Sequence, residues 1–446
     1  MSTQLPPGPR LPKLVQTLGF VLAPRQFLGA CQRRYGGAVT LSTAFDGTFV
    51  MVFDPELVRQ VFQGSGDGLH AGEANVLLEP FVGKRSVLLL DGDEHLRQRR
   101  LLLPAFHGRQ LSRYEEVIRR AADAEIDGWP LEQPFALLPS MRALTLHVIL
   151  QAVFGFEPGP AELELAERLR ELLEPIGQPR SVLLLYRLAR ARVRRDSPEL
   201  RRFLAGREAV DRLLRAEIGR RRELSDDELE ARDDVLSALL LARDEDGGAL
   251  TDDEIRDELM TLLLAGHETT ANGLAWAFDL LLHDPEVLAR ARAGDDAYLD
   301  AVAKEALRVR PVIPAIGRVV RERPFQLGSW SIPVGIEINP SIRVIHGRAD
   351  LYPQPASFRP ERFLGDDAPD TYTWLPFGGG TRRCLGASFA ALEMRMVLRR
   401  VLERAELRPA SRKLERVQLR MIALAPRDGT RVIADRVRAA DEVVSR

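Results

Sequence analysis

One of the two cysteines in this 446-residue chain lies in a segment suited to holding a metal. Residues 375–386 read LPFGGGTRRCLG, and a helical pattern follows Cys384 from Ala387 onward. Glycines let a backbone approach a flat ligand closely and adopt positive φ angles. A helix that begins just after a cysteine points its N-terminal amides at the sulfur, which favours the thiolate over the thiol. Cys384 is therefore the first candidate for chemistry, as a thiolate metal ligand.

Other uses of such glycines fit this segment less well. A phosphate-binding loop needs Lys followed by Ser or Thr after its glycines, whereas Arg382, Arg383 and Cys384 stand here. A dinucleotide-binding fingerprint needs glycine three residues after Gly380, and that position is Arg383. A buried structural cysteine is the commonest role of a lone cysteine. That role, however, requires neither the four glycines nor the paired arginines.

The segment resembles the haem-binding signature of the cytochrome P450 monooxygenases, FxxGxRxCxG. Each defined position is matched, by Phe377, Gly380, Arg382, Cys384 and Gly386. The resemblance implies haem b (iron protoporphyrin IX) with Cys384 as its axial ligand, which pushes electron density onto the iron and favours O–O cleavage. It also implies a mainly α fold with small β-sheets, in which the haem lies between a long distal helix and the cysteine loop and helix.

A long helix is predicted from about Thr251 to His283. It opens with a capping box, in which Glu254 follows Thr251 by three residues, and it stops before an Asp-Pro pair at 284–285. Its middle reads LLLAGHETT over residues 262–270. A zinc site of the HExxH type is excluded, because Ala271 stands where the second histidine is needed. From the residues alone, an ordinary core helix with an incidental polar patch is equally compatible.

The middle of this helix also resembles the distal-helix motif of the cytochrome P450 family. Gly266 costs about 1 kcal/mol relative to alanine in mid-helix. The hydroxyl of Thr269 can bond a carbonyl of the preceding turn and open the helix there, which leaves room for a small ligand. The resemblance implies that Thr269 and Glu268, a buried or half-buried acid, manage proton delivery to bound dioxygen beside Gly266.

Glu305 and Arg308 lie three residues apart in a predicted short helix, so they share a helix face and can pair. Taken alone, such a pair is usually a solvated surface salt bridge worth little. It matches the ExxR motif of the same family, and Arg362 lies in a downstream PERF segment that the family also shows. The resemblance implies a structural ion triad beneath the haem, in which removal of one member would leave buried charge unpaired.

Four further residues match positions where the family binds the haem propionates. His95 and Arg99 are four apart on a helix predicted to begin near Asp93, and Arg318 lies in a stretch that alternates like a strand. Each residue alone would be an unremarkable surface residue. Together with Arg382, they imply a propionate clamp, because Arg fits a carboxylate with two parallel hydrogen bonds.

Substrate-pocket positions are also implied by the resemblance. They are apolar and offer few charged anchors, as ligand sites mostly do. They comprise Leu77, Leu78, Phe81, Val82, Ala265, Ile313, Ala315 and Leu424. Residues 181–187 fall where the family has its access lid, and a lid helix packed on the core is favoured there over membrane contact. We expect a lipophilic substrate, such as a fatty acid, terpenoid or polyketide-like molecule.

Composition sets wider limits. The net charge of −1 gives no overall field that favours nucleic acid. Two cysteines do not make a disulfide framework, and a free thiolate suits a reducing cytosol. No apolar run is expected to reach the roughly 18 residues of a membrane span, and no signal-peptide pattern is present. Residues 5–9 resemble the proline-rich hinge of membrane-bound relatives, but we expect a bacterial cytoplasmic enzyme without anchor or fused reductase.

Length alone suggests about three domains, but the ordered series of motif residues from His95 to Cys384 spans most of the chain. We therefore predict a single domain over residues 1–446, and a monomer. Helical patterns dominate from residue 94 to residue 308. Short strands are predicted at Val39–Ser42, Phe49–Phe53, Gly317–Val320 and Met421–Ile433.

Three functions are compared. The leading one is a monooxygenase that hydroxylates or epoxidises its substrate with O2 and electrons from NAD(P)H, carried by a ferredoxin or flavodoxin and its reductase. The second is a peroxide-driven or non-redox haem-thiolate enzyme, and such relatives generally lack the acid–alcohol pair of Glu268 and Thr269. The third is a non-catalytic haem sensor or electron carrier, which has no need for Gly266, Glu268 and Thr269 beside a cavity.

The docking face for the electron carrier has two equally open interpretations. Several arginines fall in segments expected on the cysteine side of the haem: Arg97, Arg100, Arg383, Arg395 and Arg399. Clustered cations there would attract an acidic carrier and speed its encounter. Alternatively, they are ordinary helix-surface arginines, some of them paired within the chain.

Overall fold

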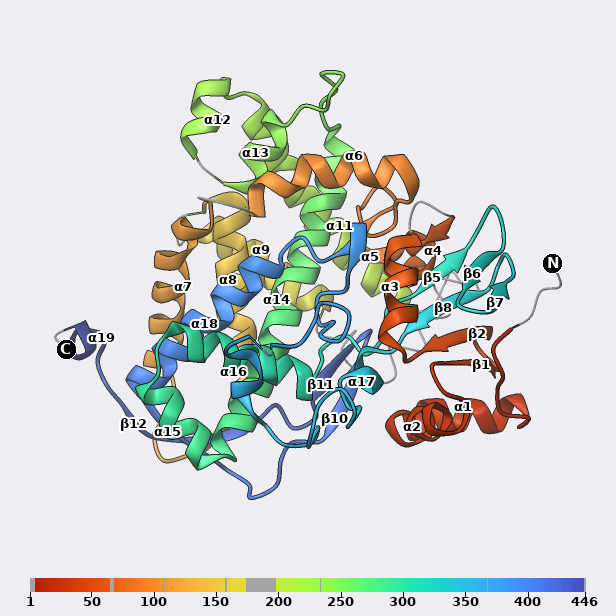
Figure 1. Ribbon diagram of the computed structural model, residues 1–446. Helices are drawn as coiled ribbons and strands as arrows, with labels where there is room; N and C mark the ends of the chain where they lie inside the picture. Colours follow the sequence, from red (N-terminus) through yellow and green to blue (C-terminus); the bar gives the residue numbers. More distant parts are fainter. Residues whose placement is uncertain are drawn as a thin grey trace.

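The computed structural model describes residues 5–64, 68–106, 110–156, 159–173, 198–232, 234–366 and 368–444. Helices make up most of the molecule, and a smaller part containing β1, β2 and β5–β8 lies to one side of them (Figure 1). The fold is thus mainly α with small sheets, as the sequence predicts. The predicted lid at residues 181–187 lies outside the described residues.

Two long helices form the centre of the helical part. Helix α14 (Asp252–Leu282) packs along α8 (Leu137–Phe154), and both are largely buried. The predicted capping box of α14 is confirmed: the Thr251 hydroxyl accepts a hydrogen bond from the Glu254 N–H at 3.3 Å, and the Glu254 carboxylate accepts one from the Thr251 N–H at 2.7 Å. The helix runs from Asp252 to Leu282, within one residue of the predicted bounds at each end.

The expectation that no apolar run approaches the length of a membrane span was wrong for α8. Among the described residues, this is the one helix whose length and composition would let it cross a membrane, and 72% of it is buried inside the protein. A helix that is apolar all round is typical of the core of a large protein. Because α8 packs against α7, α13 and α14, we interpret it as a core helix.

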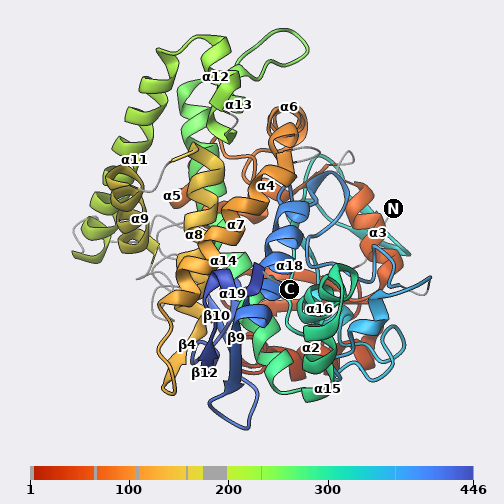
Figure 2. The ribbon, with the colours of Figure 1, turned by 90° about the vertical axis from the view of Figure 1, so that its left-hand side faces the viewer.

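Other helices surround this pair. Helix α18 follows the cysteine segment and lies beside α14 and α16, while α9 and α11 lie against each other at the edge of the helical part (Figure 2). Their bounds are α6 (Gly92–Leu102), α7 (Gln110–Asp127), α9 (Pro160–Leu173), α11 (Pro198–Arg222), α12 (Asp226–Arg232), α13 (Val235–Leu241), α15 (Pro285–Ala293), α16 (Asp296–Val309) and α18 (Ala387–Arg404). The shorter helices are α1 (Lys13–Leu22), α2 (Pro24–Tyr35), α3 (Pro55–Gln63), α4 (Ala71–Ala74), α5 (Glu79–Val82), α17 (Ile342–Ile345) and α19 (Ala440–Val444).

The largest sheet has the strand order β1-β2-β8-β5-β3, with β2 and β8 parallel and the other pairs antiparallel. A three-stranded sheet has the order β4-β12-β9, and two hairpins are formed by β6 with β7 and by β10 with β11. The strands are β1 (Ala38–Thr43), β2 (Gly47–Val52), β3 (Leu69–His70), β4 (Pro134–Ala136), β5 (Arg318–Val320), β6 (Phe325–Leu327), β7 (Trp330–Ile332), β8 (Glu337–Pro340), β9 (Ala405–Pro409), β10 (Val417–Arg420), β11 (Ala423–Pro426) and β12 (Arg431–Val437).

Three of the four predicted strands are confirmed, as β1, β2 and β5, each within two residues of the predicted ends. The fourth, Met421–Ile433, was wrong as a single strand because it comprises two strands in different sheets, β11 and β12. Gly429, with a φ of +77°, reverses the chain between them.

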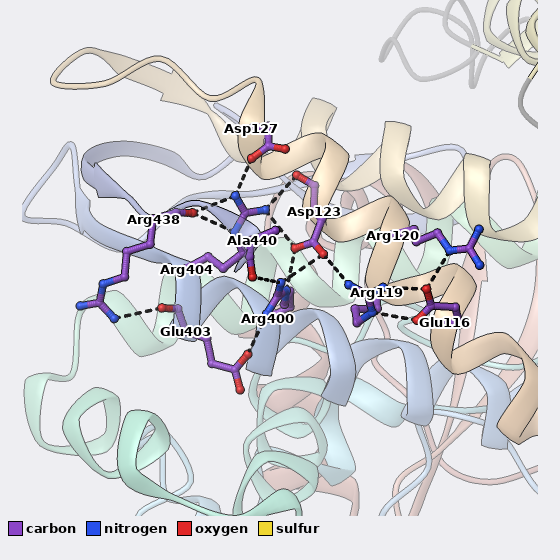
Figure 3. A network of polar contacts seen from close by, with 10 residues as sticks. All are labelled: Glu116, Arg119, Arg120, Asp123, Asp127, Arg400, Glu403, Arg404, Arg438 and Ala440. Atoms are coloured by element: carbon purple, nitrogen blue, oxygen red, sulfur yellow. Dashed lines mark hydrogen bonds and ion pairs between the residues drawn. The ribbon is translucent and has the colours of Figure 1, made fainter. Parts of the chain in front are cut away.

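A buried ionic network anchors the far end of α18 (Figure 3). Asp123 of α7 accepts hydrogen bonds from Arg400 Nε at 2.6 Å and from Arg404 Nη1 at 2.9 Å. The Arg404 side chain is fully buried and also donates to the Arg438 carbonyl at 2.8 Å. The network therefore joins α7, α18 and the C-terminal segment, and it fixes the helix whose other end follows the cysteine.

We expect Asp123→Ala to lower the free energy of unfolding by about 3–5 kcal/mol, because Arg400 and Arg404 would remain buried without their carboxylate. Glu116→Gln is the matched control: Glu116 pairs with Arg119 and Arg120 in the same network, but these side chains are exposed. Its loss should cost less than about 1 kcal/mol. Urea unfolding followed by circular dichroism measures both, and equal costs would contradict this account.

Candidate functional site

The cysteine loop needs its glycines for its own conformation. The Cys384 N–H donates to the Phe377 carbonyl at 2.9 Å and closes a tight turn. Gly380 has a φ of +65°, and a Cβ there would lie 2.2 Å from the Phe62 carbonyl oxygen of α3. A Cβ on Gly379 would lie 2.2 Å from the Phe62 ring. The loop is thus folded tightly against α3, with Cys384 at its end.

Cys384 is surrounded by protein on most sides, but its surface is accessible and not covered by other side chains. Burial raises the pKa of its thiol, although the Gly386 N–H and the charges of Arg99 and Arg383 act in the opposite direction. The predicted effect of the backbone amides is present but is outweighed by desolvation, so the loop alone does not favour the thiolate. An exposed sulfur with such surroundings faces an internal space.

Gly386 adds to this picture. Its φ lies in the ordinary negative range, and no described atom lies within 4 Å of a Cβ built on it. Neither conformation nor packing within the described chain therefore requires glycine at this position. The open space beside Cys384 leaves room for a ligand.

The four residues of the predicted propionate clamp are brought together. Burial lowers the pKa of His95 to about 3, and the neighbouring charges of Arg382, Arg99 and Arg318 lower it further. Burial lowers the pKa of both Arg318 and Arg382 to about 10. Repulsion from Arg382 adds to the shift of Arg318 and repulsion from Arg99 to that of Arg382, while Asp91 acts in the opposite direction on both. At neutral pH His95 is therefore uncharged, and the arginines form a buried positive group.

This positive group is incompletely balanced. Arg318 is only 2% exposed, and its Nε has no hydrogen-bond partner among the residues that the structure describes. Arg382 is partly engaged, because its Nη2 donates to Asp91 Oδ1 at 2.5 Å and its Nη1 to the Val87 carbonyl at 3.1 Å. Buried cations with unused donors form a site for an anion such as a carboxylate.

Asp91 was missed by sequence reasoning. Besides Arg382, its Oδ1 accepts from the backbone N–H groups of Ala71 at 2.8 Å and Gly72 at 3.0 Å. It thereby ties the cysteine loop to the start of α4. It directly precedes α6, where an aspartate normally indicates only a helix cap.

The distal helix has one face open in its middle. Ala265 is exposed, although most residues of α14 are buried. Thr269 lies one turn further on, and its hydroxyl donates to the Ala265 carbonyl at 2.6 Å. This bond confirms the predicted back-bonding. The expected opening of the helix is not present, since α14 continues without a break from Asp252 to Leu282.

The structure gives Gly266 a packing role. A Cβ there would lie 3.0 Å from the Ile149 side chain of α8, so the glycine lets the two helices approach closely. On the adjacent side, Glu268 is half-buried as predicted, and its Oε1 accepts from Arg142 Nη2 of α8 at 2.6 Å. The acid is thus held in an ion pair beside Thr269.

The predicted triad forms. Glu305 and Arg308 are fully buried and joined by two hydrogen bonds of 2.6 and 2.7 Å, and Arg362 Nε lies 3.3 Å from Glu305 Oε1. Arg308 also donates to the His346 carbonyl at 2.8 Å. The His346 Nε2 in turn accepts from the N–H of Leu375, where the cysteine segment begins, at 2.9 Å.

His346 was also missed, since a lone histidine carries no sequence signal. Burial, together with the charge of Arg308, lowers its pKa to about 3. The ring is therefore neutral and can accept the Leu375 hydrogen bond at any pH at which the protein works. It connects the triad to the cysteine loop.

The predicted pocket residues are only partly brought together. Leu78, Phe81 and Val82 form one apolar cluster with Leu264 of α14. Ile313 packs on the helical core. The Leu424 N–H donates to the carbonyl of Val312, the residue before Ile313, at 2.7 Å. Leu77 is half-buried beside Leu78. Ala315 instead packs with the N-terminal strands, so its inclusion among the pocket residues is not supported.

A cavity of about 490 Å³ lies elsewhere, and none of the predicted pocket residues lines it. It is bounded mainly by charged side chains, including Lys84, Arg207, Arg256 and Asp257. Most of these cations have acidic neighbours, and the cavity is distinct from the space beside Cys384.

Most of the arginines considered for carrier docking are paired within the chain. Arg97 donates to Asp244 and Glu254, Arg100 to Glu245, Arg395 to Asp300, and Arg399 to Asp296. Arg383 is exposed and has no ion pair among the described residues. The interpretation of ordinary, internally paired arginines therefore holds for four of the five.

Comparison with known proteins identifies the family of the chain. The family model of cytochrome P450 matches residues 6–431. The chain is 43% identical to a protein named cytochrome P450 135B1 of Mycobacterium tuberculosis, with 99% of this chain and 93% of that protein covered. It is 41% identical to one named cytochrome P450 138 of Mycobacterium bovis, with 97% of each covered.

Solved structures share the fold. The retinoic-acid-bound cyanobacterial CYP120A1 has a TM-score of 0.83 at 24% identity, with 98% of this chain and 100% of that chain covered. The cytochrome P450DA heme domain has a TM-score of 0.83 at 22% identity, with 98% of each covered. The family model and the two relatives from Mycobacterium show that the chain belongs to the cytochrome P450 family. It is a haem-thiolate monooxygenase, an oxidoreductase that uses O2.

The segment before α6 is held to α14 by buried acids. Glu258 is completely buried and accepts from the Val87 N–H at 2.6 Å and from Gln98 Nε2 at 3.1 Å. Burial raises its pKa to about 8, although both hydrogen bonds act in the opposite direction. The folded protein therefore keeps Glu258 protonated at a pH where the unfolded chain has lost this proton.

This proton predicts a pH dependence of stability. Between about pH 5 and about pH 8, the wild-type free energy of unfolding should fall by up to about 1.4 kcal/mol per pH unit relative to that of Glu258→Gln, because only the folded wild type binds the proton. Urea unfolding across this range measures the difference. Asp253→Asn is the control, since Arg215 lowers the pKa of that exposed acid. A constant difference between Glu258→Gln and wild type would refute the assignment.

Proposed function

We propose that Cys384 ligates the iron of haem b and that His95, Arg99, Arg318 and Arg382 hold the haem propionates. The observation that carries this proposal is an exposed sulfur deep in the protein beside a buried, unbalanced group of arginines. The residues fit the cofactor in charge: an iron cation would stabilise the thiolate that burial disfavours, and two carboxylates would balance the arginines. When bound, the haem supplies activation of O2 and insertion of one oxygen atom into the substrate.

Phe377 and Gly386 complete this haem site in the proposal. Phe377 makes an edge-on contact with Trp374, with ring centroids 5.8 Å apart, so it is held in place from the loop side. Gly386 leaves the space that a side chain would fill. The triad of Glu305, Arg308 and Arg362 supports the loop and takes no part in the chemistry.

We assign proton handling to Thr269 and Glu268. The Thr269 hydroxyl lies on the open face of α14, where it can hold a hydrogen-bonding partner above Ala265. Glu268 can pass a proton only after it leaves Arg142, so this ion pair controls when the acid is free. Gly266 contributes indirectly, because it allows α8 to come close enough for Arg142 to reach Glu268.

We propose a lipophilic substrate, such as a fatty acid, terpenoid or polyketide-like molecule, which is hydroxylated or epoxidised. Support comes from the apolar cluster of Leu78, Phe81, Val82 and Leu264 next to the open face at Ala265. Phe203 of α11 extends this cluster through an edge-on contact with Phe81, with centroids 5.0 Å apart.

Bacterial cytochromes P450 generally need redox partner proteins. We propose that electrons come from NAD(P)H through a ferredoxin or flavodoxin and its reductase. Because four of the five arginines considered are internally paired, recognition relies less on net positive charge and more on individual contacts; Arg383 is the one of the five without an ion pair among the described residues. We further propose a monomer in the cytoplasm, which suits the free thiol of Cys384. The retained pair of Glu268 and Thr269 argues against the peroxide-driven and non-catalytic alternatives.

The ligand assignment is tested by Cys384→Ala. This variant should lose the thiolate-type spectrum of the reduced, carbon-monoxide-bound haem. Cys31→Ala is the matched control and should keep the spectrum, since Cys31 is buried in an apolar cluster with Leu28 and Val39. A thiolate-type spectrum in Cys384→Ala would overturn the assignment.

The proton assignment is tested by Thr269→Ala. Product formation should fall by about 100-fold, a typical general acid–base contribution, while haem content and substrate binding remain. Electrons from NAD(P)H should then appear as hydrogen peroxide. Thr270→Ala is the control, because the buried Thr270 hydroxyl bonds the Gly266 carbonyl at 3.0 Å and does not lie on the open face. Unchanged product per NAD(P)H in Thr269→Ala would show that its hydroxyl has no such role.

A further inference from the structure

Helix α1 presents two polar side chains to the protein and most of its apolar side chains to solvent. Phe20 is the exception, since its ring lies edge-on to that of Phe49 with centroids 5.6 Å apart. Gln16 and Thr17 are buried. Gln16 Oε1 accepts from the Ser42 N–H and Thr17 Oγ1 from the Ala44 N–H, each at 2.9 Å. Helices of soluble proteins normally show the reverse arrangement, with an apolar stripe facing the core.

The outward side of α1 forms a continuous apolar surface. Leu14, Leu18 and Leu22 are four residues apart, share one helix face and are 69%, 56% and 75% exposed. Three further residues, each at least 46% exposed, complete what we call the N-terminal apolar face: Leu11, Val15 and Val21. The helix lies at the periphery of the molecule, away from the central helices α8 and α14 (Figure 1).

The segment of the chain that contains this face carries positive charge only. The first 45 residues contain no Asp or Glu. They contain five basic residues: Arg10, Lys13, Arg25, Arg33 and Arg34. All five are exposed, and none forms an ion pair within the part of the chain that the structure describes. The nearest acid in sequence is Asp46, in the turn between β1 and β2. This segment therefore contrasts with the whole chain, whose net charge is −1.

We propose that the N-terminal apolar face docks the enzyme on the surface of an anionic lipid membrane. An exposed leucine stripe flanked by Lys and Arg is the arrangement that inserts shallowly between lipid headgroups. Each cation near an anionic bilayer adds about 1 kcal/mol of attraction. A second copy of the chain fits less well, because pairing two such faces would bring together two groups of five cations without acids. The proposal is independent of the haem and proton assignments.

Flotation with lipid vesicles tests the apolar part. Full-length, haem-loaded protein should bind vesicles of phosphatidylcholine mixed with phosphatidylglycerol, and the variant L14Q/L18Q/L22Q should show a partition coefficient at least about tenfold lower. These side chains point away from the protein, so the haem spectrum should not change. The matched control is L131Q/L163Q/L204Q, whose leucines are 48–67% exposed elsewhere. It should bind like wild type.

Charge is tested separately. The variant R10E/K13E/R25E should lose its preference for the phosphatidylglycerol vesicles over phosphatidylcholine alone, and added salt should weaken wild-type binding to the anionic vesicles. Equal binding of wild type and L14Q/L18Q/L22Q, or no binding by wild type, would overturn the proposal. Sedimentation showing a wild-type dimer that the leucine variant loses would instead identify the face as a contact between copies.

Discussion

The buried ion pair of Glu305 and Arg308 is the interaction on which the position of the cysteine depends. Arg308 uses its remaining donors on backbone carbonyls, among them that of His346, and the His346 ring accepts the N–H of Leu375. Two fully buried charges are costly unless every donor and acceptor is satisfied. Here the guanidinium of Arg308 donates to carbonyls of separate chain segments. These hydrogen bonds offset the cost of burying the charge, and they also fix the path of the loop that ends at Cys384.

Arg318 differs from Arg308, because within the part of the chain that the structure describes its burial is not matched by hydrogen bonds from all of its donors. Its buried guanidinium keeps an Nε without a hydrogen-bond partner among the described residues, and burial raises the pKa of the Cys384 thiol. Arg308, whose donors are all used within the protein, supports the cysteine loop. Arg318, whose Nε has no partner among the described residues, is available to bind a ligand. In the haem site proposed above, a ligand completes this group, because haem would bring an iron cation to the sulfur and two carboxylates to the arginines.

Much of the fold and site could be predicted because the signals are local. The capping box that starts α14, the spacing of Glu305 and Arg308 and the glycines around Cys384 all act over a few residues. The misses involve partners distant in sequence. Glu268 meets Arg142 across 126 positions and Arg97 meets Asp244 across 147, so neither ion pair is visible in one sequence. Gly266 was assigned to the oxygen site, whereas its close contact with Ile149 follows only from how α8 and α14 cross.

Helix α1 shows a related limit. Its leucine period establishes that Leu14, Leu18 and Leu22 share a face, but periodicity does not establish which face meets the protein. That choice is made by Gln16 and Thr17, which satisfy backbone N–H groups at the edge of β1 that would otherwise lack a partner. The leucines are therefore outside because Gln16 and Thr17, together with Phe20 packed on Phe49, occupy the inner positions. Exposing such an apolar surface to water costs free energy, and the proposed contact with lipid would remove that cost.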